Sequence, residues 1–79
     1  MEEKTEIQAV FGQLLVELRK EKKQKQAELA EKSQMDVTYI SDLERGVYMP
    51  SLHTVLKLAR GLEVNLEDIA SRFVFKYKI

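Results

Sequence analysis

The residues with the most evident chemical potential lie between positions 25 and 45, where amide, hydroxyl and charged side chains recur at helical spacing. They are Lys25, Gln26, Val37, Thr38, Tyr39, Ser41, Asp42 and Arg45. Lysine, glutamine and arginine side chains donate hydrogen bonds to phosphate oxygens. Hydroxyl groups reach the edges of bases, and the methyl groups of a valine contact the methyl group of thymine. These side chains could therefore contact nucleic acid, although Thr38 and Ser41 would by themselves be ordinary surface hydroxyls, and their weight comes from the motif to which they belong.

Four of these side chains have a second interpretation that the residues alone leave open. Gln26 is either a phosphate donor or a solvated glutamine. The Tyr39 ring packs against the preceding helix, or its hydroxyl contacts a phosphate. Arg45 meets the DNA, or it interacts with the C-terminus of its own helix. Asp42 accepts a hydrogen bond from a cytosine amino group, is neutralised by Arg45, or is a repulsive surface charge; we favour cytosine, because an unpartnered acid would weaken every complex.

The sequence contains no arrangement of residues that indicates catalysis or metal binding. His53 is the only histidine, there is no cysteine, and no glycine-rich phosphate-binding loop occurs. The carboxylates fall at spacings typical of helices that carry surface ion pairs. We therefore predict that the chain is not an enzyme, that it holds no cofactor and no metal ion, and that His53 is a surface residue.

The stretch Gln26–Gly46 predicts two short amphipathic helices joined by a tight turn. Their apolar positions share one side: Leu29, Ala30, Met35, Ile40 and Leu43. The first helix runs from Gln26 to about Ser33. The second covers Val37–Arg45, because Asp36 can cap its N-terminus and Gly46 suits the position after its end. This is the layout of a helix-turn-helix, whose second helix usually lies in the major groove of DNA.

Three further helices follow from the same periodicity. The first runs from Ile7 to about Lys22, with Gly12 allowing a close helix contact. Another begins after Ser51, because Pro50 bars helix in the residue before it and Ser51 can cap. Its expected apolar stripe is Leu52, Val55, Leu56, Ala59 and Leu62, and that of the last helix is Leu66, Ile69, Ala70 and Phe73. Gly61 and Asn65 mark the turn between them.

The C-terminal segment Val74–Ile79 fits two patterns, a continued helix or a strand that alternates with lysines, and we expect helix first and an extended end. Its apolar residues are left over once the core stripes are assigned, so we place a homodimer interface there. That interface comprises Phe73, Val74, Phe75, Tyr77 and Ile79. Residues 1–79 therefore form one domain, with a core of about 7–73 and a dimerisation tail of 74–79.

The chain resembles the Xre or phage-repressor type of helix-turn-helix regulator over about residues 10–73. The matching residues are Phe11-Gly12, Leu18-Arg19, Gln26, Glu28-Leu29-Ala30, Ile40-Ser41, Glu44-Arg45-Gly46 and Pro50-Ser51. Thr38-Tyr39-Ile40-Ser41 followed by Glu44-Arg45-Gly46 is similar to the controller proteins of restriction-modification systems. The resemblance implies an all-α, five-helix, lambda-repressor-like fold with the helix-turn-helix in helices two and three. It also implies a homodimer that binds a palindromic operator in double-stranded DNA and regulates transcription.

The resemblance also assigns a structural pair, because Arg19 and Glu44 match family positions whose side chains pair beneath the motif. The chain departs from the family elsewhere. Family members carry glycine where this chain has Lys23 and Gln34, and serine or threonine where it has Lys25. The controller-like pattern places an arginine where this chain has Val37, so one guanine contact is missing.

Composition leaves a second function open. Thirteen basic and thirteen acidic residues cancel, so overall charge does not favour a polyanionic partner. One basic cluster stands beside Gln26: Lys20, Lys22, Lys23 and Lys25. Asp36, Asp42 and Glu44 make the second motif helix acidic, and the alternative is therefore a protein-interaction module, an antitoxin or adaptor with the same fold. No apolar stretch is long enough to span a membrane, and we expect a cytoplasmic protein.

Overall fold

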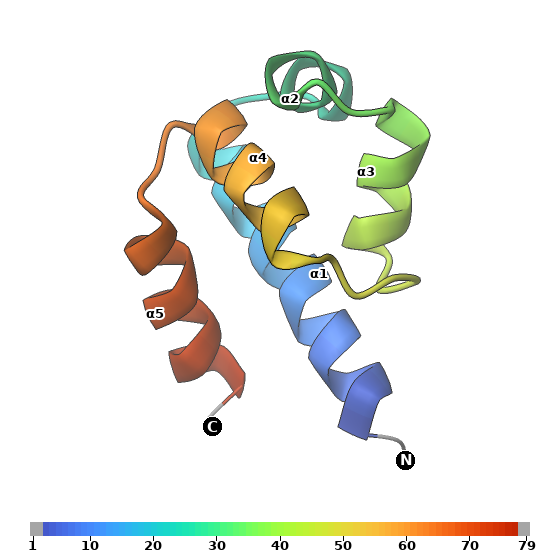
Figure 1. Ribbon diagram of the computed structural model, residues 1–79, viewed down its shortest axis with the longest axis vertical. Helices are drawn as coiled ribbons and strands as arrows, with labels where there is room; N and C mark the ends of the chain where they lie inside the picture. The colour runs from blue at the N-terminus through green and yellow to red at the C-terminus, as the bar shows by residue number, and fades with distance from the viewer. Residues whose placement is uncertain (1–2, 78–79) are drawn as a thin grey trace.

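The computed structural model describes residues 3–77, and this part of the chain forms five helices and no strand. They are α1 (Glu3–Glu21), α2 (Gln26–Ser33), α3 (Val37–Glu44), α4 (Leu52–Leu62) and α5 (Leu66–Tyr77). Figure 1 shows α3 and α5 on opposite sides of α1, with α2 across the end of the bundle and against α4. The predicted all-α fold with five helices is confirmed. None of these helices has the length and apolar character needed to cross a bilayer.

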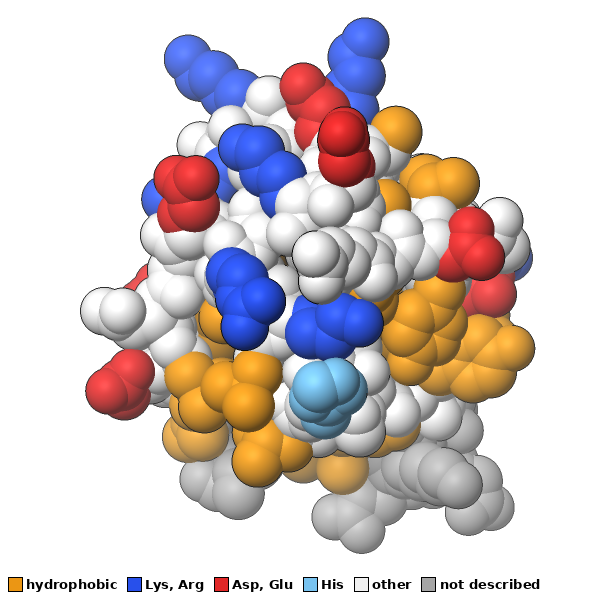
Figure 2. Space-filling model, turned by 45° about the horizontal axis from the view of Figure 1, so that its top comes forward, with side chains coloured by type: hydrophobic (Ala, Val, Ile, Leu, Met, Phe, Trp, Pro, Cys, Tyr) orange, Lys and Arg blue, Asp and Glu red, His pale blue; other side chains and the backbone are white. Residues whose placement is uncertain are grey.

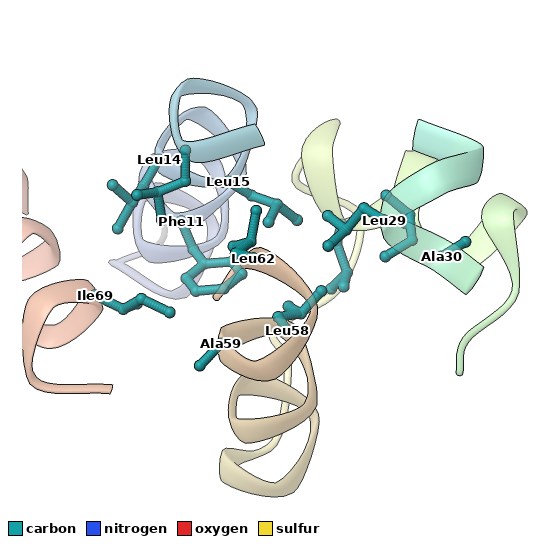
Figure 3. Packing of buried hydrophobic residues seen from close by; sticks show 12 residues of the cluster. Phe11, Leu14, Leu15, Leu29, Ala30, Leu58, Ala59, Leu62 and Ile69 are labelled. Carbon is teal, nitrogen blue, oxygen red and sulfur yellow. The ribbon is translucent and has the colours of Figure 1, made fainter. Parts of the chain in front are cut away.

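All five helices contribute to one hydrophobic core, in which side chains from α1, α2, α4 and α5 converge (Figure 3). Its buried members are Phe11, Leu14, Leu15, Leu18, Leu29, Ala30, Ile40, Leu43, Leu58, Ala59, Leu62 and Ile69. Leu52 and Leu56 were expected in this core and are instead exposed. The face of α4 that is buried centres on Leu58, Ala59 and Leu62, which leaves those two leucines beyond its border.

Several helix boundaries differ from the prediction. The first helix begins at Glu3 rather than Ile7. α3 ends at Glu44, and Arg45 follows as its C-terminal cap residue. α5 continues to Tyr77, so residues 74–77 are helical, and the expected extended end falls on residues outside the described part. Gly61 lies inside α4 rather than in the turn, which Glu63 makes instead with φ of 59°.

Gly12 and Gly61 allow two close contacts between helices. A Cβ atom on Gly12 would lie 2.5 Å from the carbonyl oxygen of Glu44, so α1 approaches the end of α3 as expected. A Cβ atom on Gly61 would lie 2.1 Å from Ser33 Oγ, at the contact of α4 with α2. Both contacts constrain the motif helices, because α1 approaches the backbone of α3 and α4 approaches side chains of α2.

The two positions where family members carry glycine have left-handed backbone conformations, with φ of 56° at both Lys23 and Gln34. A side chain in this conformation costs about 1–2 kcal/mol. At Gln34 the strained residue ends α2, and the next amide, of Met35, bonds back to the Ala30 carbonyl at 2.8 Å. Lys23 and Gln34 therefore occupy the positions of glycine without changing the backbone conformation of the two turns.

The helix caps are partly as predicted. Ser51 Oγ accepts a hydrogen bond from the Thr54 amide at 3.1 Å and caps α4. Asp36 occupies the capping position of α3, but its side chain forms no capping bond, so that prediction was wrong about the chemistry. Lys25 precedes α2, and Glu28 Oε1 accepts from its amide at 2.7 Å. This bond is the glutamate half of a capping box, in which the third residue of the helix accepts from the amide of the capping residue.

Candidate nucleic-acid interface

α3 has one buried face and one face that is open to solvent. Ile40 and Leu43 are completely buried, whereas Val37 and Thr38 are exposed at the start of the helix. Ser41 is half-buried on the following turn. A valine and two short hydroxyl side chains thus lie at or near a solvent-accessible helix surface, where they can approach a flat or grooved partner closely.

The Tyr39 ring is half-buried and packs against the core. Its centroid lies 5.6 Å from that of Tyr48 in the connection between α3 and α4, with the ring planes tilted by 45°. The sequence left ring packing and phosphate contact as equal interpretations, and the position of the ring accords with packing. The partner Tyr48 could not be predicted from helical spacing, because it follows the end of the helix.

Asp42 and Arg45 form an ion pair between Oδ1 and Nη2, one turn apart on α3. The Arg45 side chain is 65% exposed and that of Asp42 only 20%. Arg45 therefore neutralises Asp42, which was one of the three interpretations of this acid. The guanidinium lies at the rim of the surface, while the carboxylate is recessed behind it.

Arg19 and Glu44 form the pair that the family resemblance implied. Arg19 Nε lies 2.6 Å from Glu44 Oε2, and Nη2 lies 3.1 Å from Oε1. Their side chains are only 13% and 6% exposed. Two parallel hydrogen bonds between a guanidinium and a carboxylate set a definite mutual orientation. The pair therefore fixes the C-terminal end of α3 against α1.

Gln26 is drawn into this pair. Its Nε2 donates to Glu44 Oε1 at 2.8 Å, because the start of α2 lies beside the end of α3. It is therefore not the solvated glutamine of the alternative interpretation. Gln24, which the sequence did not single out, accepts from Arg19 Nη1 through its carbonyl oxygen at 2.9 Å. Its own Nε2 donates to the Gly61 carbonyl at 3.2 Å, so a residue in the charged connection joins α1 to α4.

Lys25 and its neighbouring lysines remain available to a partner. The cluster of Lys20, Lys22, Lys23 and Lys25 is exposed, and no carboxylate among the side chains described, those of residues 6–77, forms an ion pair with any of them. Lys20 lies in the last turn of α1, and the other three lie in the connection between α1 and α2. Four unpaired positive charges at this corner create a local field that the neutral overall composition hides.

The C-terminal residues assigned to dimerisation divide into two groups. Phe73 and Tyr77 are half-buried: the Phe73 ring lies 6.3 Å from that of Phe11, and Tyr77 stacks on Phe73 at 5.8 Å. Val74 is exposed, and Phe75 is 84% exposed. Ile79 lies outside the described residues. The first two thus belong to the internal packing of the protein, and the second two face solvent.

An apolar groove of about 190 Å³ lies between α4 and α5. Its lining residues are Phe11, Met49, Pro50, Leu52, Val55, Leu66, Ile69, Ala70 and Phe73. In Figure 2, hydrophobic side chains lie on either side of the exposed histidine, with lysine and arginine side chains above it.

No group of three potential metal ligands occurs in the part of the chain that the structure describes.

The sequence profile of the helix-turn-helix family matches residues 15–69. The chain belongs to the helix-turn-helix family. It is 40% identical over 58 residues to the immunity repressor protein of Bacillus phage phi105, a match that covers 73% of this chain and 40% of the repressor. The chain spans less than two thirds of the length of the curated phage relatives that it matches.

Solved controller structures have the same fold as this helix-turn-helix chain. The restriction-modification controller protein C.AhdI from Aeromonas hydrophila is 39% identical, with a TM-score of 0.74 over 77% of this chain and 92% of that chain. The controller protein C.Esp1396I, solved as a tetramer in complex with its natural 35 base-pair operator, is 26% identical, with a TM-score of 0.85 over 92% and 96%. The resemblance to repressors and controllers that the motif residues indicated is confirmed.

Proposed function

We propose that this chain is a sequence-specific DNA-binding regulator of transcription that binds a palindromic operator as a homodimer. The observation that carries the proposal is the placement of α3, which exposes short outer side chains while the nearly buried Arg19–Glu44 pair holds the end of the helix against α1. A recognition helix must be held rigidly if its side chains are to discriminate between bases. The phage repressor and the operator-bound controller among its relatives support the same function.

The side chains of the interface have distinct proposed roles. Thr38 and Ser41 contact base edges, and Val37 contacts a thymine methyl group. Lys25 and its lysine neighbours contact phosphates, as does Arg45 at the end of α3. Gln26 keeps its bond to Glu44 and directs the remaining hydrogen of its amide, together with the N-terminus of α2, towards a phosphate.

We place the homodimer interface on the surface formed by α4 and α5. Its exposed apolar residues are Leu52, Leu56, Val74 and Phe75. Leu52 also lines the groove between the two helices, whereas Phe75 lines a separate hollow with Leu14 and Glu17 of α1. Phe73 and Tyr77 support this surface from below. A palindromic operator presents its half-sites about 34–36 Å apart, so each half-site requires its own recognition helix. One described chain offers one α3 within extents of 33 × 24 × 21 Å, and a second copy supplies the other.

The proposed setting is the prokaryotic cytoplasm, where the protein acts as a restriction-modification controller or as a phage-type repressor. The alternative of a protein-interaction module rested on three acids of the second motif helix. Glu44 is paired with Arg19 and Asp42 with Arg45, which leaves Asp36 as the acid of that group without an ion pair in the described chain. The acidic character that argued against DNA is therefore mostly neutralised.

Selection of bound sequences from a pool of random duplexes tests the proposal. We expect a two-fold symmetric consensus and a binding constant that falls steeply with salt. Thr38→Ala and Ser41→Ala should each relax the preference at particular base pairs while changing stability by less than about 0.5 kcal/mol. Recovery of no enriched sequence, with binding insensitive to salt, would contradict the proposed function.

The interface is tested separately by sedimentation. Val74→Asp combined with Phe75→Asp should convert the dimer to a monomer, because two charges would have to be buried in an apolar contact. Both residues are exposed in the single chain, so the helices should still form. Gln13→Glu, which adds a charge at an exposed position of α1, is the matched control. A doubly substituted protein that still sediments as a dimer would refute this placement.

A further inference from the structure

We infer that Asp42 limits the sequence-independent affinity of the protein for DNA by holding the guanidinium of Arg45. This inference rests on the proposed function, and it assigns to an acid on the recognition helix a role other than reading a base. The two side chains are paired through Asp42 Oδ1 and Arg45 Nη2. Arg45 is the one basic residue in the segment Val37–Arg45.

The difference in exposure between the partners determines how the pair responds to DNA. Arg45 is 65% exposed and can swing towards a phosphate, whereas Asp42 is 20% exposed and is held on α3. When Arg45 reaches a phosphate, it either leaves Asp42 or shares its charge with it. In both cases part of the attraction between the guanidinium and the phosphate is offset by the carboxylate, which stays behind at the same surface.

The net charge at the C-terminal end of α3 depends on Asp42 and Arg45 alone. Glu44 cannot neutralise Arg45, because both of its oxygens accept hydrogen bonds from Arg19 and one of them also from Gln26. With Asp42 present, the outer end of α3 carries no net charge. Without that acid it would carry one positive charge, enough to neutralise one more phosphate.

The consequence concerns specificity. Phosphate contacts are the same on every sequence, and a regulator must reject a very large number of non-operator sites. A recognition helix with a self-neutralised arginine adds little to non-specific binding. The discrimination then falls to Val37, Thr38 and Ser41, whose contacts depend on the base.

A set of charge variants tests this role on random-sequence duplex and on the selected operator. Asp42→Asn preserves the shape of the side chain and removes its charge. We expect it to tighten binding to both duplexes by about fivefold, the value in water of the one close contact between opposite charges that Arg45 otherwise loses when it turns to a phosphate. The log–log salt slope should become more negative by about 0.9, as one more phosphate is neutralised.

Two companion variants show whether the effect passes through Arg45. In the Arg45→Ala background, Asp42→Asn should give no more than the small gain expected of an acid that holds no arginine, with no change in slope. Asp36→Asn removes an exposed acid at the opposite, N-terminal end of α3 that forms no ion pair in the described chain, and it should give a smaller gain with an unchanged slope. Thermal melts establish that every variant is folded at the assay temperature.

The remaining outcomes each overturn the inference. A gain of about fivefold that persists in the Arg45→Ala background would mean that Asp42 acts as a general repulsive charge. A changed preference at one base pair per half-site would mean that Asp42 reads a base. Wild-type binding with no gain in Asp42→Asn would refute the inference and leave the proposed function intact, whereas absence of DNA binding by every variant would refute both.

Discussion

Truncation of Glu44 to alanine should be among the most damaging single changes in this protein. It would remove both carboxylate acceptors of Arg19, whose side chain is only 13% exposed. The guanidinium would retain its bond to the Gln24 carbonyl at 2.9 Å, but its charge would stay desolvated without a counter-ion. Breaking a buried ion pair from one side costs about 3–5 kcal/mol. We expect a loss at the lower end of this range, because Gln24 still accepts one hydrogen bond.

A double-mutant cycle separates this pair from its surroundings. Thermal and chemical unfolding of Arg19→Ala, Glu44→Ala and the double variant should show that the double loss is smaller than the sum by at least about 1 kcal/mol. The reason is that the second truncation removes a charge already left unpaired by the first. Losses that add within about 0.5 kcal/mol would refute an interaction between the two residues. They would also remove the basis for regarding the pair as the support of α3.

Three further predictions concern the backbone and pH. Gln34→Gly should raise stability by about 0.5–1 kcal/mol, as relief of the left-handed strain exceeds the added chain entropy; an unchanged melting temperature would contradict this. Gly12→Ala should lower stability by about 1–3 kcal/mol, because its Cβ would meet the Glu44 carbonyl at 2.5 Å; a stabilised variant would contradict this. The hydrogen bond from Arg72 lowers the pKa of Glu21, so the stabilisation is present above about pH 4.3 and is lost as pH falls through the lowered pKa. Glu21→Gln should therefore make the melting temperature decline less below that pH, and a decline equal to that of wild type would contradict the role of the pair.

Helical periodicity predicted the fold well because most apolar positions lie near the middle of a stripe. Leu29, Ile40 and Leu43 are such positions, and all three are completely buried. Leu52 and Leu56 lie at the border of the α4 stripe, where burial depends on how the neighbouring helix crosses. That angle is set by contacts such as Gly61 against Ser33, between residues far apart in the sequence. The pattern of apolar residues along the sequence contains no information on this crossing angle.

The sequence predicted which residues lie at the candidate site, but it predicted few of their hydrogen-bond partners. The exposure of Val37 and Thr38 follows from the same periodicity that buries Ile40. The bond from Gln26 to Glu44 does not, because it depends on where the start of α2 meets the end of α3. Gln24 was overlooked for a similar reason: in a lysine-rich connection, an amide gives no sign that it bonds to α4.

Asp42 and Glu44, near the end of α3, each pair with an arginine, but their positions on the helix give the two ion pairs different roles. Asp42 and Glu44 are two residues apart and so point in nearly opposite directions around the helix axis. Glu44 faces α1, where low exposure makes its pair with Arg19 strong and structural. Asp42 faces outwards, where solvent weakens its pair with Arg45 and allows the guanidinium to exchange partners. Because the inner pair holds the helix still, the outer pair can alter DNA affinity without altering the fold. Exchange of the roles is excluded by geometry, since an acid at position 42 cannot reach Arg19 and an acid at position 44 is already fully occupied.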